Sequence, residues 1–145
     1  MLGAIVEAVS RRSYASYVQA SIFAPLSMRD SHVDQTIALD REQSGRLSSG
    51  HVYVFGFPVA RTLPHEGDRL PTAALISSAA DMGRFLVAQL RTDSSDVLSA
   101  AGFAQMHAGG APSNGFSYAF GWRDGTIAGE RAVHHGGIVP HFRAR

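Results

Sequence analysis

Two segments near the start of the chain carry apolar residues at helical spacing. Residues 2–9 predict an amphipathic helix, because apolar side chains recur three or four positions apart at Leu2, Ile5, Val6 and Val9. A second helix is expected from residue 14, with one face formed by Tyr14, Tyr17, Val18, Ser21 and Ile22. Proline disfavours the α conformation in the preceding residue, so Pro25 should end this helix.

The middle of the chain has poor periodicity. Glycine and proline interrupt residues 31–70 repeatedly, and only residues 51–57 hint at a short strand. Such a long, mostly irregular stretch is unusual inside a compact domain. We therefore expect either a functional loop region or a segment that packs against polypeptide outside this sequence.

Helical periodicity returns after residue 78. Ser78 and Asp81 resemble a capping box, in which the Ser78 hydroxyl accepts from the Asp81 amide and the Asp81 carboxylate accepts from the Ser78 amide. The helix that follows should bury Met82, Phe85, Leu86, Gln89 and Leu90. Residues 97–107 predict another helix, which ends at the glycines and proline of residues 109–112.

The last part of the chain has the character of β-strands. Residues 116–122 are aromatic and alternating, and residues 131–135 form a second strand candidate. Residues 142–145 look like the start of a third strand with no partner after it. Asp124-Gly125 and Ala128-Gly129 are the expected turns.

Composition excludes several classes of function. The 145 residues carry a formal net charge of +1, and the arginines are scattered, so no basic stripe for a nucleic acid is formed. The absence of cysteine excludes disulfides and thiolate chemistry. No apolar run is long enough for a membrane segment, and no signal peptide is visible, so localisation stays unknown.

Five segments, in order, resemble the β-lactamase-related serine hydrolases, which include class C β-lactamases, D-alanyl-D-alanine carboxypeptidases and related esterases. Residues 2–10 resemble the helix that follows the family's Tyr-x-Asn motif. Residues 14–28 resemble the next helix and its I-F-x-P-L-G-M ending, with Ser27 in place of the glycine. Residues 75–86 resemble the family segment G-L-x-S-[ST]-A-x-D-M-x-R-F, and residues 118–122 resemble the strand Y-G-[YF]-G-W. Residues 135–140 resemble the family's third active-site motif.

The resemblance implies an α+β chain with part of a β-lactamase/transpeptidase-like fold, in which a helical lobe adjoins an incomplete antiparallel sheet. Residues 1–110 would supply mainly the helical lobe and loops, and residues 111–145 would supply strands of the sheet. Unpaired sheet edges and exposed apolar surface should follow. The alternative is an unrelated α+β domain with coincidental matches.

The family's nucleophile is absent from this sequence. The family pairs a serine and a lysine in Ser-x-x-Lys, one helical turn apart, so that both groups reach the acyl carbonyl. All 13 basic residues are arginine, so the chain cannot contain this motif. The nearest match to Tyr-x-Asn, Tyr14-Ala15-Ser16, falls inside the second predicted helix, and the resemblance places that motif before residue 1.

The third motif is the part of the active site that the resemblance assigns to this chain. His135 would take the place of the usual lysine or histidine, and Gly136 and Gly137 would keep the strand edge clear for the substrate backbone. The Ile138 amide would donate to the oxyanion. The alternative for His135 is a histidine at a strand end with no role, and Pro140-His141-Phe142 departs from the common Pro-Gly-Phe.

Other constellations favour structural roles. His134, His135 and His141 suggest a metal site, but neighbouring strand residues point to opposite faces and no carboxylate is placed to act as the third ligand, so no metal is expected. The resemblance implies no cofactor. The spacing of Ser78 and Asp81 fits helix capping better than a catalytic dyad.

Five further residues have mainly structural interpretations. We expect Trp122 to pack beneath its strand, and the alternative is that it lines the pocket. Tyr53 and Phe55 could wall a cleft or pack in the core, and the Arg11-Arg12 pair is expected at a solvated helix end.

Three functional hypotheses follow. The first is a fragment of a serine hydrolase that acts on a small-molecule or peptide acyl substrate, such as a β-lactam, a D-Ala-D-Ala peptide or an ester, and is inactive alone. The second is a non-catalytic module that binds peptidoglycan peptides. The third is one half of a split enzyme, in which a complementary chain carries Ser-x-x-Lys.

Overall fold

The first helical segment forms as predicted. In the computed structural model, which describes residues 1–33, 45–61, 70–73, 75–90, 97–113, 116–139 and 142–144, α1 spans Leu2–Ser10. Arg11 ends it in the left-handed conformation, with φ at 55°, and donates its backbone N–H to the Glu7 carbonyl at 2.8 Å. Ser13 then caps α2 (Tyr14–Val18) by accepting from the Ser16 amide.

The second helix has an irregular ending. It continues from α2 into the π-helical turn η1 (Gln19–Phe23) and closes in a Schellman motif. The Met28 amide donates to the Phe23 carbonyl at 2.8 Å, and the Ser27 amide donates to the Ala24 carbonyl at 3.0 Å. Ser27 lies in the left-handed region, with φ at 56°. This is the position where the resembling family usually has glycine, and the conformation explains that preference.

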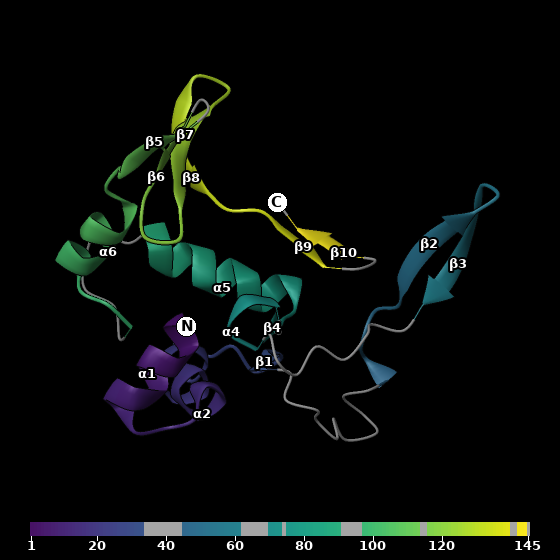
Figure 1. Ribbon diagram of the computed structural model, residues 1–145, viewed down its shortest axis with the longest axis horizontal. Coiled ribbons are helices and arrows are strands. Elements are labelled where there is room, and N and C mark those ends of the chain that lie inside the picture. Colours follow the sequence, from purple (N-terminus) through teal and green to yellow (C-terminus); the bar gives the residue numbers. More distant parts are fainter. Residues whose placement is uncertain are drawn as a thin grey trace.

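A small cluster of buried apolar side chains lies against this second helix. Four side chains form it, namely Val18, Phe23, Met28 and Val33, and Ala88 and Phe103 are buried elsewhere. Partly buried side chains pack around them, namely Tyr14, Ala15, Ile22, Leu26 and Phe85. Phe85 comes from α5 (Ala79–Leu90), so the core joins the N-terminal helices to that central helix. Figure 1 shows α5 between the α1–α2 pair and the strands β5–β8.

A short two-stranded sheet adds a second link between these parts of the chain. Strand β1 (His32–Val33) pairs antiparallel with β4 (Leu75–Ile76), which lies between α4 (Leu70–Ala73) and α5. Gly3 of α1 packs against α4, where a Cβ atom would lie 2.3 Å from the Pro71 ring. Close approach of these two helices therefore requires glycine at position 3.

The strand predicted over residues 51–57 is a hairpin instead. Strand β2 (Gly50–Val54) pairs with β3 (Phe57–Arg61), and residues 55 and 56 make the turn between them. Phe55 and Gly56 both have positive φ, at 51° and 85°, as a two-residue type I′ turn requires. The prediction missed the turn because Phe55 continues the apolar pattern. Figure 1 shows this hairpin projecting to one side of the molecule.

The largest sheet in the described residues has four antiparallel strands in sequence order. It follows α6 (Ala100–His107), which begins three residues later than predicted because Ser99 caps it by accepting from the Gly102 amide. The strands are β5 (Ala111–Ser113), β6 (Phe116–Tyr118), β7 (Arg123–Ile127) and β8 (Glu130–His134).

Two details of this sheet differ from the sequence prediction. The strand expected over residues 116–122 ends at Tyr118, because the chain turns at Gly121, where φ is 79°. The turn expected at Asp124-Gly125 is wrong, since both residues pair with β8 inside β7. The turn at Ala128-Gly129 is confirmed, with positive φ at both residues.

The end of the chain also has a partner that the sequence prediction missed. Strand β9 (Gly137–Val139) pairs antiparallel with β10 (Phe142–Ala144), so that Ile138 lies opposite Arg143. The segment expected to start an unpaired strand is therefore half of a small hairpin.

Apolar side chains remain exposed on the helices, as the resemblance predicted. On α1, Leu2 and Val9 are 78% and 82% exposed, and on α5 Leu90 is 77% exposed. The predicted burial of Met82, Leu86 and Leu90 is thus wrong, whereas Gln89 is buried. A bilayer-spanning length of apolar helix is not found among the described residues.

Candidate functional site

The third-motif residues lie where the four-stranded sheet ends and the next hairpin begins. His135 directly follows β8, Gly136 links the two sheets, and Gly137 and Ile138 are the first two residues of β9. The prediction placed the whole motif on one strand. The structure instead places His135 and Gly136 in a connection and only the last two residues on a strand.

His135 is exposed and contacts Tyr118 from another strand. The Tyr118 hydroxyl and His135 Nε2 lie 3.0 Å apart, and the two rings meet edge to face with centroids 6.1 Å apart. Tyr118 is the last residue of β6, and β7 lies between β6 and β8 in the sheet. The sequence prediction used Tyr118 only as part of a strand motif and missed this contact.

The glycine and isoleucine of the motif face open space. A Cβ atom added to Gly137 would meet no heavy atom within 4 Å, and the Ile138 side chain is 74% exposed. Packing within the described chain therefore does not require glycine at position 137. A clear edge at this point is compatible with the close approach of a ligand backbone.

The histidines do not assemble into a metal site within the described residues. His134 is half-buried and lies opposite Arg123 on β7, whereas His135 is exposed. No group of three histidine, aspartate, glutamate or cysteine side chains that could hold an ion occurs in the described part of the chain. His141 lies outside the described residues.

Ser78 and Asp81 form half of the predicted capping box. The Ser78 hydroxyl accepts from the Asp81 amide at 3.2 Å, as expected. The Asp81 carboxylate is directed elsewhere: it accepts from the Asp30 amide at 2.7 Å, from the Ser31 hydroxyl at 2.8 Å and from the Arg84 guanidinium at 2.6 Å. Asp81 is 0% exposed, so no substrate reaches it.

The electrostatics of Asp81 fit a structural ion. Burial, the largest single influence, raises the pKa of the Asp81 carboxyl, but hydrogen bonds from Ser31, from the Asp30 amide and from Arg84 together hold that pKa below its usual value. The carboxylate is therefore ionised near neutral pH and stabilises the junction between α5 and the segment before β1.

A second polar cluster joins α5 and α6 to the sheet. His107 Nε2 lies 3.0 Å from Gln89 Oε1, and the His107 ring meets Trp122 edge to face at 5.4 Å. Arg131 donates to both carboxylate oxygens of Asp124, at 2.9 and 3.1 Å, and to the His107 carbonyl. Burial and the positive charge of Arg131 lower the pKa of His107, and the negative charge of Asp124 raises it. The net result is a pKa below the usual value.

Trp122 is half-buried and packs against the helices, but it lies in the turn between β6 and β7 and not on a strand as predicted. Its ring stacks on Phe85 with centroids 6.3 Å apart, and its indole N–H donates to the Met106 sulfur. The tryptophan therefore packs the sheet against both helices. Trp122 lies between Tyr118, the last residue of β6, and Arg123, the first residue of β7, so this packing anchors the turn that joins the two strands.

The β-lactamase family profile matches residues 1–145, the whole of this sequence. The chain belongs to the β-lactamase family. Comparison with curated proteins found no match. Solved structures with the same fold support the assignment of the architecture.

The similar structures include hydrolases and penicillin-binding proteins. An octameric penicillin-binding protein homologue from Pyrococcus abyssi has a TM-score of 0.80 and 25% identity, over 98% of this chain and 32% of that chain. A D-stereospecific amidohydrolase from Streptomyces sp. has a TM-score of 0.76 and 20% identity, over 95% and 41% of the two chains. A class C β-lactamase from Rhodobacter sphaeroides has a TM-score of 0.69 and 22% identity, over 88% and 34%.

This β-lactamase-family chain spans about a third to two fifths of the length of those structures. Its fold is accordingly α+β and a partial β-lactamase/transpeptidase-like fold, with a helical lobe and an incomplete antiparallel sheet, as the sequence resemblance implied.

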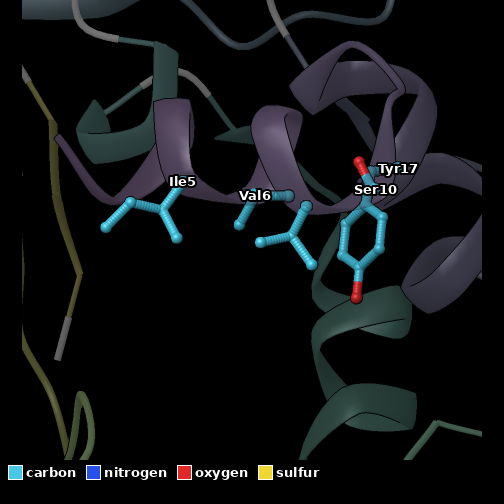
Figure 2. Close-up of a pocket in the computed structure, with 5 residues that line it drawn as sticks. Ile5, Val6, Ser10 and Tyr17 are labelled. Carbon is cyan, nitrogen blue, oxygen red and sulfur yellow. The ribbon is translucent and has the colours of Figure 1, made fainter.

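A hollow on the helical part of this β-lactamase-family chain lies away from the third motif in sequence. It is lined by Ile5, Val6, Val9, Ser10 and Tyr17. Figure 2 shows Ile5, Val6 and Ser10 along α1, with Tyr17 at the end of the row. Its lining is mostly apolar and contains no pair of acid and base groups, so we assign it no chemistry.

Two aromatic residues of the β2–β3 hairpin are exposed. Tyr53 is 78% exposed, and Phe55, at the turn, is 97% exposed. The alternative that these residues pack in a core is therefore wrong for this chain. A role in walling a cleft stays a prediction.

Proposed function

We propose that this chain forms the acyl-binding edge of a β-lactamase-type serine hydrolase site and does not hydrolyse substrate as the 145-residue polypeptide. Residues 1–110 would belong mainly to the helical lobe and loops of that enzyme, and residues 111–145 to its sheet. The observation that carries the proposal is the family match over the whole chain, combined with an exposed His135 beside the open edge at Gly137.

Each residue of the edge has a role in this proposal. His135 provides a hydrogen-bond donor, and in its protonated form a positive charge, toward the carbonyl or carboxylate of an acyl substrate. Gly136 and Gly137 leave room for the substrate backbone, and the Ile138 amide donates to the oxyanion of the tetrahedral intermediate. Loss of one such donor typically costs about 10²–10³ in rate in a complete enzyme.

The sequence contains no lysine, so the family's Ser-x-x-Lys nucleophile is not encoded in it. A serine without an adjacent base is a weak nucleophile at neutral pH. The substrate class we propose is an acyl compound of the kind that the family's motifs serve: a β-lactam, a D-Ala-D-Ala peptide or an ester.

The test measures turnover and binding separately on the purified chain. We expect no hydrolysis of nitrocefin or p-nitrophenyl acetate and no covalent labelling by a fluorescent penicillin. We expect weak, saturable binding of acetyl-D-Ala-D-Ala, which is monitored through changes in amide chemical shifts. Binding should be reduced in His135→Ala and unchanged in the exposed control His51→Ala. Covalent labelling of a serine would refute the lack of turnover, and absence of any ligand-dependent shift would refute the binding edge.

The exposed apolar side chains of α1 and α5 favour a second candidate, in which complementary polypeptide carrying Ser-x-x-Lys completes the enzyme. Leu2, Val9 and Leu90 present large apolar surfaces that a monomeric soluble protein normally covers. Reading the DNA directly upstream for an in-frame Ser-x-x-Lys provides the first test. Adding the encoded polypeptide to this chain should then restore penicillin labelling, and failure to do so would refute this candidate.

A further inference from the structure

We propose that Tyr118 is a positioning residue that sets the tautomer and ring orientation of His135, so that Nδ1 of His135 is the donor presented to the acyl ligand. This inference rests on the proposed function for the role of His135, but its structural part concerns only the contact between the two side chains. The contact joins the Tyr118 hydroxyl to His135 Nε2 at 3.0 Å, with the ring planes 80° apart.

The contact bridges strands that are not neighbours. Tyr118 ends β6 and His135 follows β8, while β7 pairs with both of these strands. Adjacent strands lie about 4.8 Å apart, so the backbones of β6 and β8 are separated by roughly 10 Å. The Tyr118 side chain therefore spans the start of β7, where Arg123 lies opposite both Tyr118 and His134, to reach His135.

The backbone around Tyr118 fixes the start of this bridge. In the ladders, Tyr118 lies opposite Ala111 on one side and Arg123 on the other. Gly110 approaches so closely that a Cβ atom there would lie 2.1 Å from the Tyr118 carbonyl oxygen. A residue held on both sides in this way can orient a partner, whereas His135 itself lies in a connection between two sheets.

Proton chemistry determines what the hydroxyl does. In a neutral imidazole one ring nitrogen donates and the other accepts. A phenol is a good donor and the unprotonated imidazole nitrogen is a strong acceptor, so the Tyr118 hydroxyl donates to Nε2 and the histidine proton resides on Nδ1. In water a neutral histidine carries its proton mainly on Nε2. Tyr118 thereby selects Nδ1–H as the group that faces a ligand.

This arrangement resembles the way that outer hydrogen bonds orient catalytic and ligating histidines in general. The partner of one ring nitrogen determines the chemistry of the other. Tyr118 need not touch the ligand to affect its binding, so we assign it a positioning role rather than a catalytic one.

The experiment reads the tautomer directly. Long-range ¹H–¹⁵N correlation spectra of the histidine rings are recorded at about pH 8, above the usual histidine pKa of about 6.5, for the full chain and for Tyr118→Phe. His135→Ala identifies the His135 signals. Tyr118→Phe keeps the aromatic ring but removes the hydroxyl. The matched control is Tyr53→Phe, at an exposed tyrosine of the β2–β3 hairpin.

We expect the Nδ1–H tautomer of His135 in the wild type and in Tyr53→Phe, and the Nε2–H tautomer in Tyr118→Phe. Binding of acetyl-D-Ala-D-Ala should weaken about fivefold in Tyr118→Phe, as for the loss of one typical hydrogen bond. An aromatic ring at position 118 that lacks the hydroxyl should not restore the Nδ1–H tautomer of His135.

The outcomes separate the two proposals. If His135 of the wild type carries its proton on Nε2, the positioning role is overturned, and this result does not depend on the folding of Tyr118→Phe. If His135 has the Nδ1–H tautomer in both the wild type and Tyr118→Phe, the positioning role is also overturned. A tautomer change without binding of the peptide by the wild type supports the contact and overturns the proposed function. Binding of the peptide by the wild type, with no tautomer change in Tyr118→Phe, supports the proposed function and overturns the positioning role of Tyr118.

Discussion

The buried Asp81 carboxylate accepts a hydrogen bond from the Ser31 hydroxyl at 2.8 Å, across 50 positions of the sequence. The same carboxylate accepts from the Asp30 amide and from Arg84. Ser31 is itself buried, and its hydroxyl also lies 2.8 Å from that of Ser77. One charged group thus joins the start of α5 to the segment before β1, next to the small core.

Replacement of Asp81 by Asn should destabilise the chain. Asparagine retains one acceptor oxygen but places an NH₂ group where the carboxylate accepts from a donor, and hydrogen bonds to charged groups are worth roughly 1.5–3 kcal/mol. We expect Asp81→Asn to lose about that amount in urea unfolding at pH 7. The control Asp30→Asn alters the solvent-accessible ion pair of Asp30 with Arg46 and keeps the Asp30 amide, so it should cost under about 1 kcal/mol.

The pH dependence of stability gives a second readout of the same ion. The pKa of Asp81 is lower in the folded state than its usual value of about 3.9. The stabilisation is therefore present above that usual value and is lost as pH falls toward the folded pKa. Unfolding measured between pH 7 and pH 3 should show a smaller acid dependence in Asp81→Asn than in the wild type. Equal slopes would contradict the assignment.

Ser27→Gly should stabilise the chain. Ser27 is the left-handed residue of the Schellman motif that ends the second helix, and residues other than glycine adopt this conformation at a cost of roughly 1–2 kcal/mol. The greater entropy of glycine in the unfolded chain offsets part of this gain. We expect a net increase of about 1 kcal/mol in urea unfolding.

Position 21 provides the control for that variant, because it lies inside η1. Glycine is destabilising within a helix, so Ser21→Gly should lower stability by about 0.5–1 kcal/mol. If Ser27→Gly also lowered stability, the left-handed conformation assigned to Ser27 would be wrong.

The local elements of this fold could be predicted from sequence, because their signals are local. Apolar spacing located α1, and the Ser78 hydroxyl marked the start of α5. Asp124-Gly125 misled the prediction because its composition is typical of a turn, yet Gly125 pairs with Ala132 in a regular ladder. Tertiary pairing there outweighs the local preference.

The contacts that organise the candidate site could not be predicted in the same way. The family resemblance located His135 and the glycines after it, but the Tyr118 partner of His135 depends on the order of three strands. The burial of Asp81 depends on a segment 50 positions away. The helix-capping pattern correctly predicted the partner of the Asp81 amide, but it assigned the Asp81 carboxylate to the Ser78 amide and not to the distant Ser31 hydroxyl.

His107→Gln should flatten the dependence of stability on pH near neutrality. The pKa of His107 is below its usual value of 6.5, because burial and the charge of Arg131 disfavour the protonated ring. In this pH range His107 binds a proton more readily in the unfolded chain than in the folded chain. The wild type should therefore lose stability as pH falls from about 7 through the folded pKa. Glutamine stays uncharged and retains a donor toward Gln89 Oε1.

The measurement for this variant is the midpoint of thermal unfolding between pH 5 and pH 8. His51→Gln is the matched control, since His51 is exposed on β2. We expect its pH profile to follow the wild type. A His107→Gln profile as steep as that of the wild type would show that another group causes the slope.

Gly137→Ala separates a glycine required by folding from one required by a ligand. The added methyl group would meet no heavy atom within 4 Å, and the Gly137 backbone does not lie in the positive-φ region, so stability should change by less than about 0.5 kcal/mol. Gly110→Ala is the contrasting variant, because its Cβ would collide with the Tyr118 carbonyl at 2.1 Å. We expect that variant to be destabilised by at least 1–3 kcal/mol, as is typical of overpacking.

If the edge at Gly137 receives the backbone of an acyl ligand, the methyl group of Gly137→Ala occupies the space that the ligand needs. Binding of acetyl-D-Ala-D-Ala should then weaken by about tenfold or more, which corresponds to roughly 1.4 kcal/mol, while unfolding in urea stays as in the wild type. Unchanged affinity together with unchanged stability would mean that neither the fold nor a ligand requires glycine at this position. Because the two measurements are independent, loss of binding in a fully stable Gly137→Ala variant can be attributed to the ligand edge and not to a damaged fold.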